Sequence, residues 1–279
     1  MQLVLPTRVL DLRVPCVMGV LNVTPDSFSD GGRHAGVDRA VERALAMAAE
    51  GAAIVDVGGE STRPGAAAVG EQEELDRVVP VIEHLRARSG VVISVDTMKP
   101  AVMRAACAAG AEIVNDVMAL RAPGALDAVR DAGAAVCLMH MQGEPRTMQA
   151  SPAYANVLAE VREFLEQRLR ACRAAGIAEG RMVLDPGIGF GKTLEHNLTL
   201  LANLEHLAID RSPLLIGISR KSMFGSLLGR AVEDRLAGGL AGAALAVWQG
   251  AAIVRAHDVA QTVDAVRTAY QIKSRRAPT

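Results

Sequence analysis

The sequence predicts an α/β protein in which residues 1–279 form one domain, a closed (β/α)8 TIM barrel. Eight short segments rich in Val, Ile and Leu alternate along the chain with segments of helical periodicity. Such alternation is typical of parallel barrels, which run to roughly 250 residues as single units. Hydrophobic residues make up 50% of the chain and aromatic residues only 3%, so we expect an aliphatic core. A doubly wound open sheet is the alternative fold for the same alternation.

The expected strands are short apolar runs. A small hairpin from residues 3–5 and 9–14 precedes the barrel and is expected to be structural. The first barrel strand lies in residues 17–21, where the aliphatic residues fit a strand that is covered on both faces. The later strands are expected at residues 54–57, 91–95, 113–114, 135–139, 182–184, 214–218 and 251–254.

The expected helices have apolar residues three and four positions apart. In residues 37–48 this stripe lies opposite charged residues, and Gly51 is a C-terminal stop signal. Further helices are expected at residues 75–85, 102–109, 126–132, 157–172, 194–207 and 259–272. Pro80 predicts that the second of these is kinked or divided in two. Residues 236–254 carry no charge, but Gln249 and Gly250 favour a buried helix followed by a strand over a membrane span.

Composition argues against several classes of function. A formal net charge of -1 and few aromatic rings argue against a nucleic-acid-binding protein. The 4 cysteines are scattered without a CxxC pair, which predicts reduced, buried thiols and neither a zinc site nor a disulfide framework. Pro6 and Arg8 interrupt any signal-peptide core, so we expect a cytoplasmic protein that does not bind membranes.

Polar residues stand where the expected strands give way to loops. In a parallel barrel these strand ends meet at one mouth, where active sites lie. Together they describe a site that can hydrogen-bond a flat ligand rich in heteroatoms and neutralise an anion. The residues are Asn22, Asp56, Asp96, Asn115, Asp185, Lys221, Arg255 and His257.

Three loops carry further signals. Residues 186–193, PGIGFGKT, miss the phosphate-loop pattern because Pro186 stands where GxxxxGK[ST] needs Gly, so we interpret the glycines as a tight turn beside the pocket. Residues 219–222, SRKS, and 255–257, RAH, place cations after the last two strands, where barrels often bind anions. A cluster of surface salt bridges is the alternative for these cations.

Seven motifs identify a family resemblance that covers nearly the whole chain. They are GVLNVTPDSFSDGG, VDVGGESTRPG, SVDT, VND, DPGIGFGK, GISRKS and VRAHD, in this order. The set closely resembles the dihydropteroate synthases of folate biosynthesis, with Val117 a conservative departure. The resemblance implies a transferase that condenses 6-hydroxymethyl-7,8-dihydropterin diphosphate with 4-aminobenzoate to give 7,8-dihydropteroate and diphosphate. It also implies sulfonamide inhibitors, a homodimer and a Mg2+ cofactor near Asn22.

The resemblance also implies roles for individual residues. Asp185 and Asn115 would pair with the pterin edge, and Asp96 would meet the ring near N8. Lys221 would hold the O4 and N5 side, and Arg255 would stack on the ring face. These five form the expected catalytic set, which Val117, Met139, Phe190 and Gly217 complete as the pterin site. The expected aminobenzoate site and flexible loops comprise Phe28, Asp30, Thr62, Arg63, Pro64, Phe190, Lys221 and Ser222. The expected diphosphate site comprises Asn22, Thr62, Arg63, Arg255 and His257.

Two other functions fit part of the same pattern. A corrinoid-dependent pterin methyltransferase barrel would share the Asp and Asn residues at the strand ends, but it would not need the 22–32 loop or the SRKS segment. A non-catalytic pterin-binding homologue would fit a damaged loop, whereas both loop motifs are intact here. Release of diphosphate that depends on aminobenzoate distinguishes all three.

Overall fold

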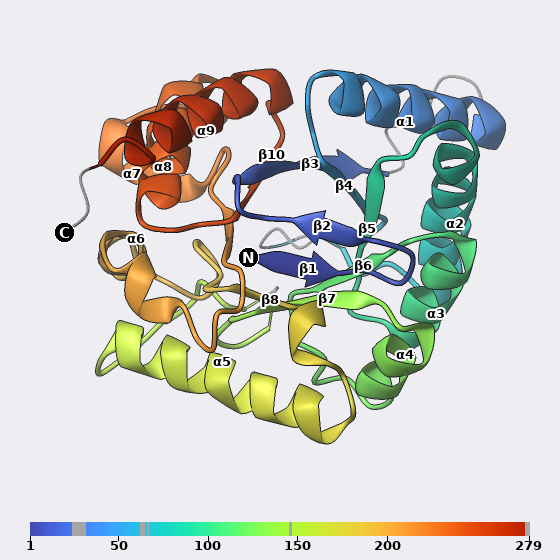
Figure 1. Cartoon of the computed structure of the whole chain (residues 1–279), viewed down its shortest axis with the longest axis horizontal. Helices are drawn as coiled ribbons and strands as arrows, with labels where there is room; N and C mark the ends of the chain where they lie inside the picture. The colour runs from blue at the N-terminus through green and yellow to red at the C-terminus, as the bar shows by residue number, and fades with distance from the viewer. Residues whose placement is uncertain (24–31, 62–64, 66, 145–146, 277–279) are drawn as a thin grey trace.

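In the computed structural model, which describes residues 1–23, 32–61, 65, 67–144 and 147–276, eight parallel strands form a barrel inside a ring of helices (Figure 1). The hydrogen-bonded order is β8-β7-β6-β5-β4-β3-β10-β9. A parallel bridge between Leu184 and Leu214, with the Leu184 amide donating to the Pro213 carbonyl at 2.9 Å, joins the two ends of this order. The barrel prediction is confirmed, and the open-sheet alternative is wrong.

The elements alternate regularly after an N-terminal hairpin. The strands are β1 Gln2–Val4, β2 Val9–Asp11, β3 Cys16–Asn22, β4 Ile54–Gly58, β5 Val92–Asp96, β6 Ile113–Asp116, β7 Ala135–Met139, β8 Met182–Asp185, β9 Leu215–Gly217 and β10 Ile253–Ala256. The helices are α1 Gly32–Ala49, α2 Glu71–Arg88, α3 Pro100–Ala109, α4 Ala125–Ala132, α5 Val157–Ala174, α6 Leu194–Ala202, α7 Ser222–Leu228, α8 Leu236–Trp248 and α9 Val259–Lys273. None of the helices in these described ranges is long and apolar enough to cross a membrane.

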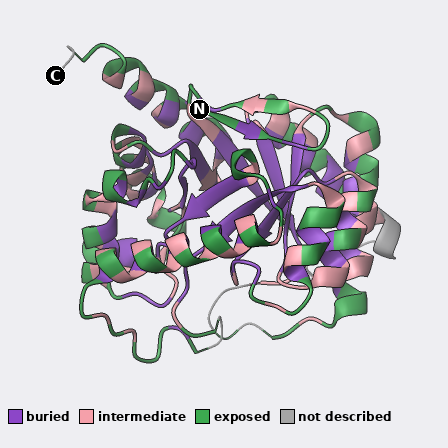
Figure 2. Cartoon of the chain, turned by 60° about the horizontal axis from the view of Figure 1, so that its bottom comes forward, coloured by how far each residue is buried: buried purple, intermediate pink, exposed green. Residues whose placement is uncertain are grey.

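The two-residue period of the strands separates two cores. Alternate residues such as Val55 and Val57 of β4 pack outward in the main hydrophobic cluster beneath the helices. Ile54 points into the barrel, where it joins a second, smaller apolar cluster. Figure 2 shows the buried strands enclosed by helices whose outer faces are exposed.

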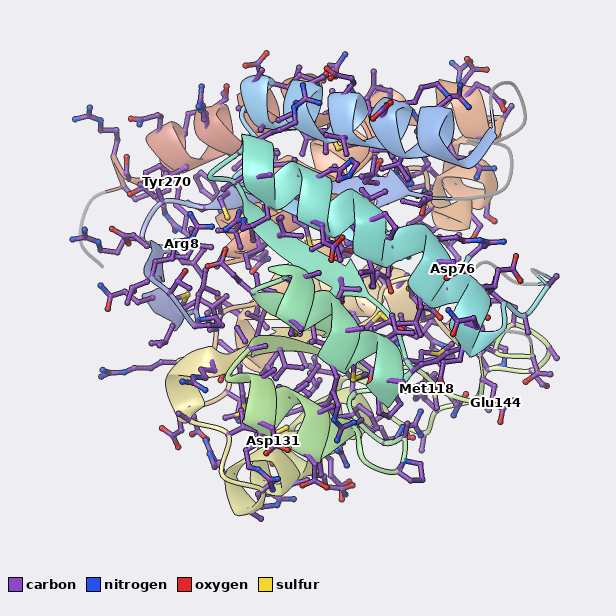
Figure 3. The ribbon with its side chains drawn as sticks, turned by 90° about the vertical axis from the view of Figure 1, so that its right-hand side faces the viewer. Arg8, Asp76, Met118, Asp131, Glu144 and Tyr270 are labelled. Atoms are coloured by element: carbon purple, nitrogen blue, oxygen red, sulfur yellow. The ribbon has the colours of Figure 1, made fainter. Side chains whose placement is uncertain are left out.

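The hairpin plugs the N-terminal end of the barrel. Leu3, Leu5 and Leu12 are buried in the inner cluster with the first inward residues of the strands. Buried Glu112 fastens this plug, because it accepts hydrogen bonds from Thr7 Oγ1 at 2.8 Å and from Arg8 Nε at 3.1 Å. Figure 3 shows Arg8 at one end of the molecule and Met118 and Glu144 at the other. The plug therefore leaves only the C-terminal mouth for a site.

Three local predictions need correction. Of the kink or division predicted at Pro80, the division is wrong, because α2 runs through the proline as one helix. Val78 and Val81 on either side of it are buried and offset the lost backbone hydrogen bond. The helix expected at 194–207 ends at Ala202, and a 3-10 turn, η3 Leu204–Leu207, follows. The helix expected to be buried, α8, is only half buried, because Leu245 is 65% exposed.

Removing Glu112 is expected to loosen the plug. Glu112→Ala leaves Arg8 and Arg86 without their shared carboxylate, so we expect the free energy of unfolding to fall by about 2 kcal/mol. Urea denaturation measures this change. Asp11→Ala, which removes the exposed ion pair with Arg13, serves as control and should have no measurable effect. Equal stability of parent and Glu112→Ala would contradict the role of the plug.

Candidate active site

A charged floor lies inside the barrel, above the apolar plug. Arg255 of β10 donates from Nε to Asp56 Oδ2 at 2.7 Å and from Nη2 to Asp96 Oδ2 at 2.7 Å. Asn115 Nδ2 also donates to Asp56 Oδ2, at 2.9 Å. All three acceptor and amide residues are buried, so this network is held away from water. The Arg255 guanidinium thus links β10, near the end of the chain, to β4 and β5 in its first half.

Burial governs the ionisation of this floor. It raises the pKa of Asp96 to about 7, against the attraction of Arg255 and with the repulsion of Asp56. The pKa of Arg255 is raised, because the carboxylates of Asp56 and Asp96 outweigh the burial that would lower it. The floor therefore holds a permanent cation beside a carboxyl that can change its charge near neutral pH.

Asp185 lies at the end of β8, against the turn formed by residues 186–191. Its Oδ1 accepts from the Gly187 amide at 2.7 Å. Burial raises the pKa of Asp185, whereas the Gly187 amide and the cations Lys221, Lys192 and Arg255 lower it. The turn is as tight as predicted: Gly187 has φ +67°, and a Cβ there would stand 1.9 Å from the His140 carbonyl oxygen. Only glycine permits this approach of two backbones.

An apolar wall borders the charged residues. Val117, Met139 and Phe190 belong to one cluster with Met141 and Met148 at the mouth of the barrel. The Lys221 ammonium lies 4.1 Å from the centroid of the Phe190 ring, a cation-π contact. A flat ring bound over the floor would therefore meet thioether and aromatic surface at its side.

The loops after β9 and β10 meet at the same mouth. The backbone amide and Nδ1 of His257 lie 3.3 and 3.2 Å from Ser219 Oγ. Arg220, in a left-handed conformation with φ 59°, donates from Nη2 to Asp258 Oδ1 at 2.6 Å. The loops are thus joined to each other, with Gly217 paired in register with Arg255.

Comparison with known proteins identifies the family. The family model of pterin binding enzymes matches residues 18–257. Dihydropteroate synthase of Escherichia coli is 54% identical over 258 residues, which cover 92% of each chain. The chain belongs to the dihydropteroate synthase family of pterin-binding enzymes. The resemblance inferred from the seven motifs is confirmed.

Solved structures of this family have the same fold. The Yersinia pestis dihydropteroate synthase in complex with a sulfonamide drug matches with a TM-score of 0.93 and 51% identity, covering 98% of this chain and 100% of that chain. The Xanthomonas albilineans enzyme with 4-aminobenzoic acid matches with a TM-score of 0.91 and 52% identity, covering 99% of both chains. The same enzyme in complex with 7,8-dihydropteroate matches with a TM-score of 0.89 and 49% identity, covering 99% of this chain and 100% of that chain.

The structure brings most of the residues implied by the family to one mouth. Asp96, Asn115, Asp185, Lys221 and Arg255 lie at or just after strand ends, as predicted. Asn22 ends β3 and is exposed, and Ser222 is exposed at the first position of α7. The remaining predicted site residues lie outside the described ranges; they are Phe28, Asp30, Thr62, Arg63 and Pro64.

Sequence reasoning gave no role to several residues of the mouth. The sequence pattern marks Asp56 only as a strand-end residue, yet Asp56 is the common acceptor of Arg255 and Asn115. The sequence signal for this role is a carboxylate inside an apolar strand. A buried carboxylate needs a hydrogen-bond partner, so this position predicts one for Asp56. His140 and Lys192 contact each other at 2.9 Å across two loops. The two residues are 52 positions apart, and no sequence pattern predicts their contact.

Asp96 is expected to make the fold less stable as pH rises. Its folded pKa of about 7 lies above the ordinary value of 3.8, so between these values the folded state binds more protons than the unfolded state and stability falls with pH. Asp96→Asn removes this group and should gain stability over the parent increasingly from about pH 4 to pH 7. Urea denaturation across this range, with exposed Asp131→Asn as control, measures the difference. A difference that stays constant with pH would contradict the raised pKa.

Proposed function

We propose that this chain condenses 6-hydroxymethyl-7,8-dihydropterin diphosphate with 4-aminobenzoate, giving 7,8-dihydropteroate and diphosphate. The observation that carries the proposal is the set of Asp96, Asn115 and Asp185, buried at one mouth beside Lys221 and Arg255. Relatives of about half identical sequence bear the name of this activity and bind its aminobenzoate substrate and its product.

The carboxylates and the amide suit the pterin ring. The 2-amino-4-oxo edge of a pterin offers adjacent N–H donors, which a carboxylate such as Asp185 accepts in pairs. Asn115 can complete this edge with its carbonyl oxygen, because its Nδ2 is already committed to Asp56. Buried acceptors without a ligand donor are costly, so this floor favours a ligand that supplies N–H groups.

The same charges suit the transition state that we propose. The C–O bond between the pterin methyl group and the diphosphate breaks, and the departing oxygen keeps the electron pair. Positive charge then develops on the methyl carbon and the ring, where the carboxylates of Asp96 and Asp185 stabilise it. The amine of aminobenzoate supplies the electron pair for the new C–N bond, and its proton passes to solvent. Arg255 and His257, with Asn22, Thr62 and Arg63, form the proposed site that retains the departing diphosphate.

Mg2+ is proposed to accompany the diphosphate. Within the described ranges no group of three His, Cys, Asp or Glu residues could hold a metal by itself. The Asn22 side chain is exposed and offers one amide oxygen. This donor set fits an ion that keeps waters and phosphate oxygens as its main ligands, as Mg2+ does. When bound, the ion would screen the negative charge of the leaving group.

Diphosphate release tests the proposed reaction and both alternative functions. The parent enzyme should release diphosphate from the pterin diphosphate only when aminobenzoate is present. Asp185→Ala should lose pterin affinity by roughly 10^4-fold or more, because a site built to pair with N–H donors discriminates strongly when that pairing is lost. Calorimetric titration with 6-hydroxymethyl-7,8-dihydropterin measures this affinity.

Two outcomes would defeat this function. No release by the parent would favour the non-catalytic homologue, and methyl transfer from a methylated folate to a corrinoid protein would favour the methyltransferase. Pterin affinity of Asp185→Ala close to that of the parent would remove Asp185 from its role.

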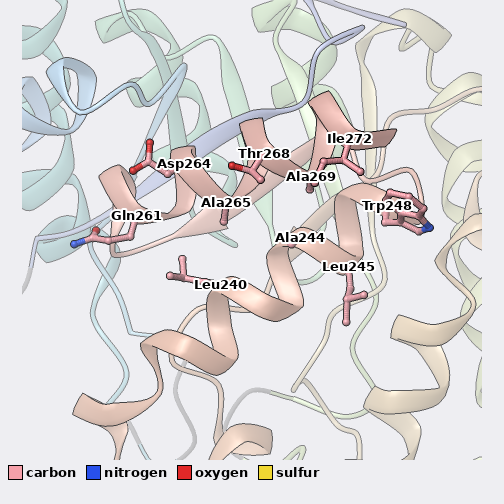
Figure 4. A pocket seen from close by; sticks show the side chains of 10 residues that line it. All are labelled: Leu240, Ala244, Leu245, Trp248, Gln261, Asp264, Ala265, Thr268, Ala269 and Ile272. Atoms are coloured by element: carbon pink, nitrogen blue, oxygen red, sulfur yellow. The ribbon is translucent and has the colours of Figure 1, made fainter. Parts of the chain in front are cut away.

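We further propose a homodimer through α8 and α9. A groove of about 590 Å3 lies between these helices, lined mainly by apolar residues (Figure 4). Leu245, Trp248 and Ile272 along this groove are 65%, 37% and 59% exposed. Such a continuous apolar patch is typical of an interaction site. Small residues also line this groove, and those such as Ala244 and Ala265 would allow helices of two chains to approach closely.

Leu245→Asp is expected to give a monomer, because it places a charge in the apolar groove. Sedimentation velocity should show a dimer for the parent and a monomer for the variant. Val14→Asp, at another exposed apolar position, is the matched control and should remain dimeric. A monomeric parent, or a dimeric Leu245→Asp, would contradict this interface.

Two smaller proposals complete the function. Sulfonamides are proposed as inhibitors, supported by the sulfonamide complex of the Yersinia pestis relative. A cytoplasmic location is proposed because all 4 cysteines are free thiols, as is usual in a reducing compartment.

A further inference from the structure

Lys192 is a buried cation that the proposed reaction does not use. It is only 3% exposed, although it is the residue that made PGIGFGKT look like a phosphate loop. Its ammonium donates to the carbonyl oxygens of Gly187 and Phe190, each at 3.0 Å. It also lies 2.9 Å from His140 Nδ1. Burying an ammonium costs free energy, because it loses its hydration, and its contacts must offset that cost.

The partners of Lys192 form a complete set for an ammonium. An ammonium has three N–H donors and no acceptor. It faces four acceptors here: the carbonyl oxygens of Gly187 and Phe190, the ring nitrogen of His140 and, at 3.4 Å, the His140 carbonyl oxygen. Burial lowers the pKa of His140 to about 2, which keeps the imidazole neutral and Nδ1 able to accept. Burial also lowers the pKa of Lys192 to about 7, although Asp185 opposes this shift.

These contacts join the two sides of the pterin site. The turn that Lys192 binds supplies the Gly187 amide to Asp185, at 2.7 Å from Oδ1. It also carries Phe190, whose ring lies under the Lys221 ammonium. His140 extends the contact to the end of β7, next to Met139 of the apolar wall. Without the ammonium, the carbonyl groups of Gly187 and Phe190 would lose this buried donor beside Asp185.

From this geometry we infer that Lys192 is a positioning residue for the pterin site. It holds the 186–191 turn so that Asp185 and Phe190 keep their places, and it does not touch the substrate. The inference rests on the proposed function, which assigns pterin recognition to Asp185. It predicts a selective loss of affinity: loss of Lys192 should weaken pterin binding, whereas diphosphate binding around His257 should not change.

Lys192→Met tests this inference, because methionine keeps the length of the side chain and removes the donors. Affinity for 6-hydroxymethyl-7,8-dihydropterin should fall by about 10- to 100-fold, as expected for lost hydrogen bonds to a charged group. Affinity for inorganic diphosphate should change by no more than about twofold. Calorimetry near pH 6.5, below the pKa of Lys192, measures both ligands, and thermal melting checks the fold.

Tyr154→Phe is the matched control. The Tyr154 hydroxyl donates to the Gly191 carbonyl at 2.7 Å, so this variant also loses a hydrogen bond to the turn, but at its outer end. Pterin affinity should stay within about twofold of the parent. If Lys192→Met fails to fold, His140→Leu removes one acceptor of the ammonium and should also weaken pterin binding selectively.

Chemical rescue separates positioning from a general loss of stability. Lys192→Ala removes three methylene groups and the ammonium, which propylammonium can replace. Added propylammonium should restore pterin affinity, whereas propan-1-ol, which is uncharged, should not. Pterin affinity of Lys192→Met within about twofold of the parent would overturn the inference, and so would equal losses for both ligands without rescue. Absence of diphosphate release by the parent would instead defeat the proposed function. The two failures are distinguishable, because the binding comparisons do not depend on turnover.

Discussion

The two-residue period of the barrel strands is the constraint on which the rest of the structure depends. Each strand gives the interior alternate side chains, so an apolar residue near its start is followed by a polar one near its end, as in Ile54 and Asp56 or Val183 and Asp185. A register shift of one residue would turn these carboxylates toward the helices and the main hydrophobic cluster. The same alternation that builds the core therefore also aims the site. The apolar plug can close one end of the barrel because the inward-facing carboxylates of these strands lie near the other.

The polar end combines a cost to stability with a fit to the ligand. Arg255 holds two buried carboxylates with one guanidinium, which leaves Asp56 Oδ1 buried without a partner in the described part of the structure. Removing charged groups from water is unfavourable, and for this reason burial raises the pKa of Asp96. In the proposed function, a pterin would supply N–H donors to these acceptors, and its cation-like transition state would supply positive charge. The features that weaken the empty fold are thus the ones that the ligand satisfies.

Loop packing extends this arrangement beyond the strands. Gly187 and Gly191 let the turn after β8 lie directly on the backbone after β7, where a Cβ would stand 1.9 and 2.5 Å from carbonyl oxygens of His140 and Gln142. That close packing buries carbonyl groups of the turn, and Lys192 donates hydrogen bonds to them. Structural and functional demands meet in this turn, since its amide also binds Asp185.

The sequence by itself determined the fold and the place of the candidate site. Periodicity located the hairpin, the eight strands and most helices, and the polar residues at strand ends marked the mouth, because parallel strands in a barrel must bring those ends together. Motif resemblance determined the family. Only the tertiary structure decided that α2 continues through Pro80, that α8 exposes Leu245, and that Asp56, His140 and Lys192 make buried hydrogen-bond contacts at the mouth. The physical reason is that helix continuity, exposure and buried hydrogen bonds depend on contacts between segments distant in the chain, which local periodicity does not encode.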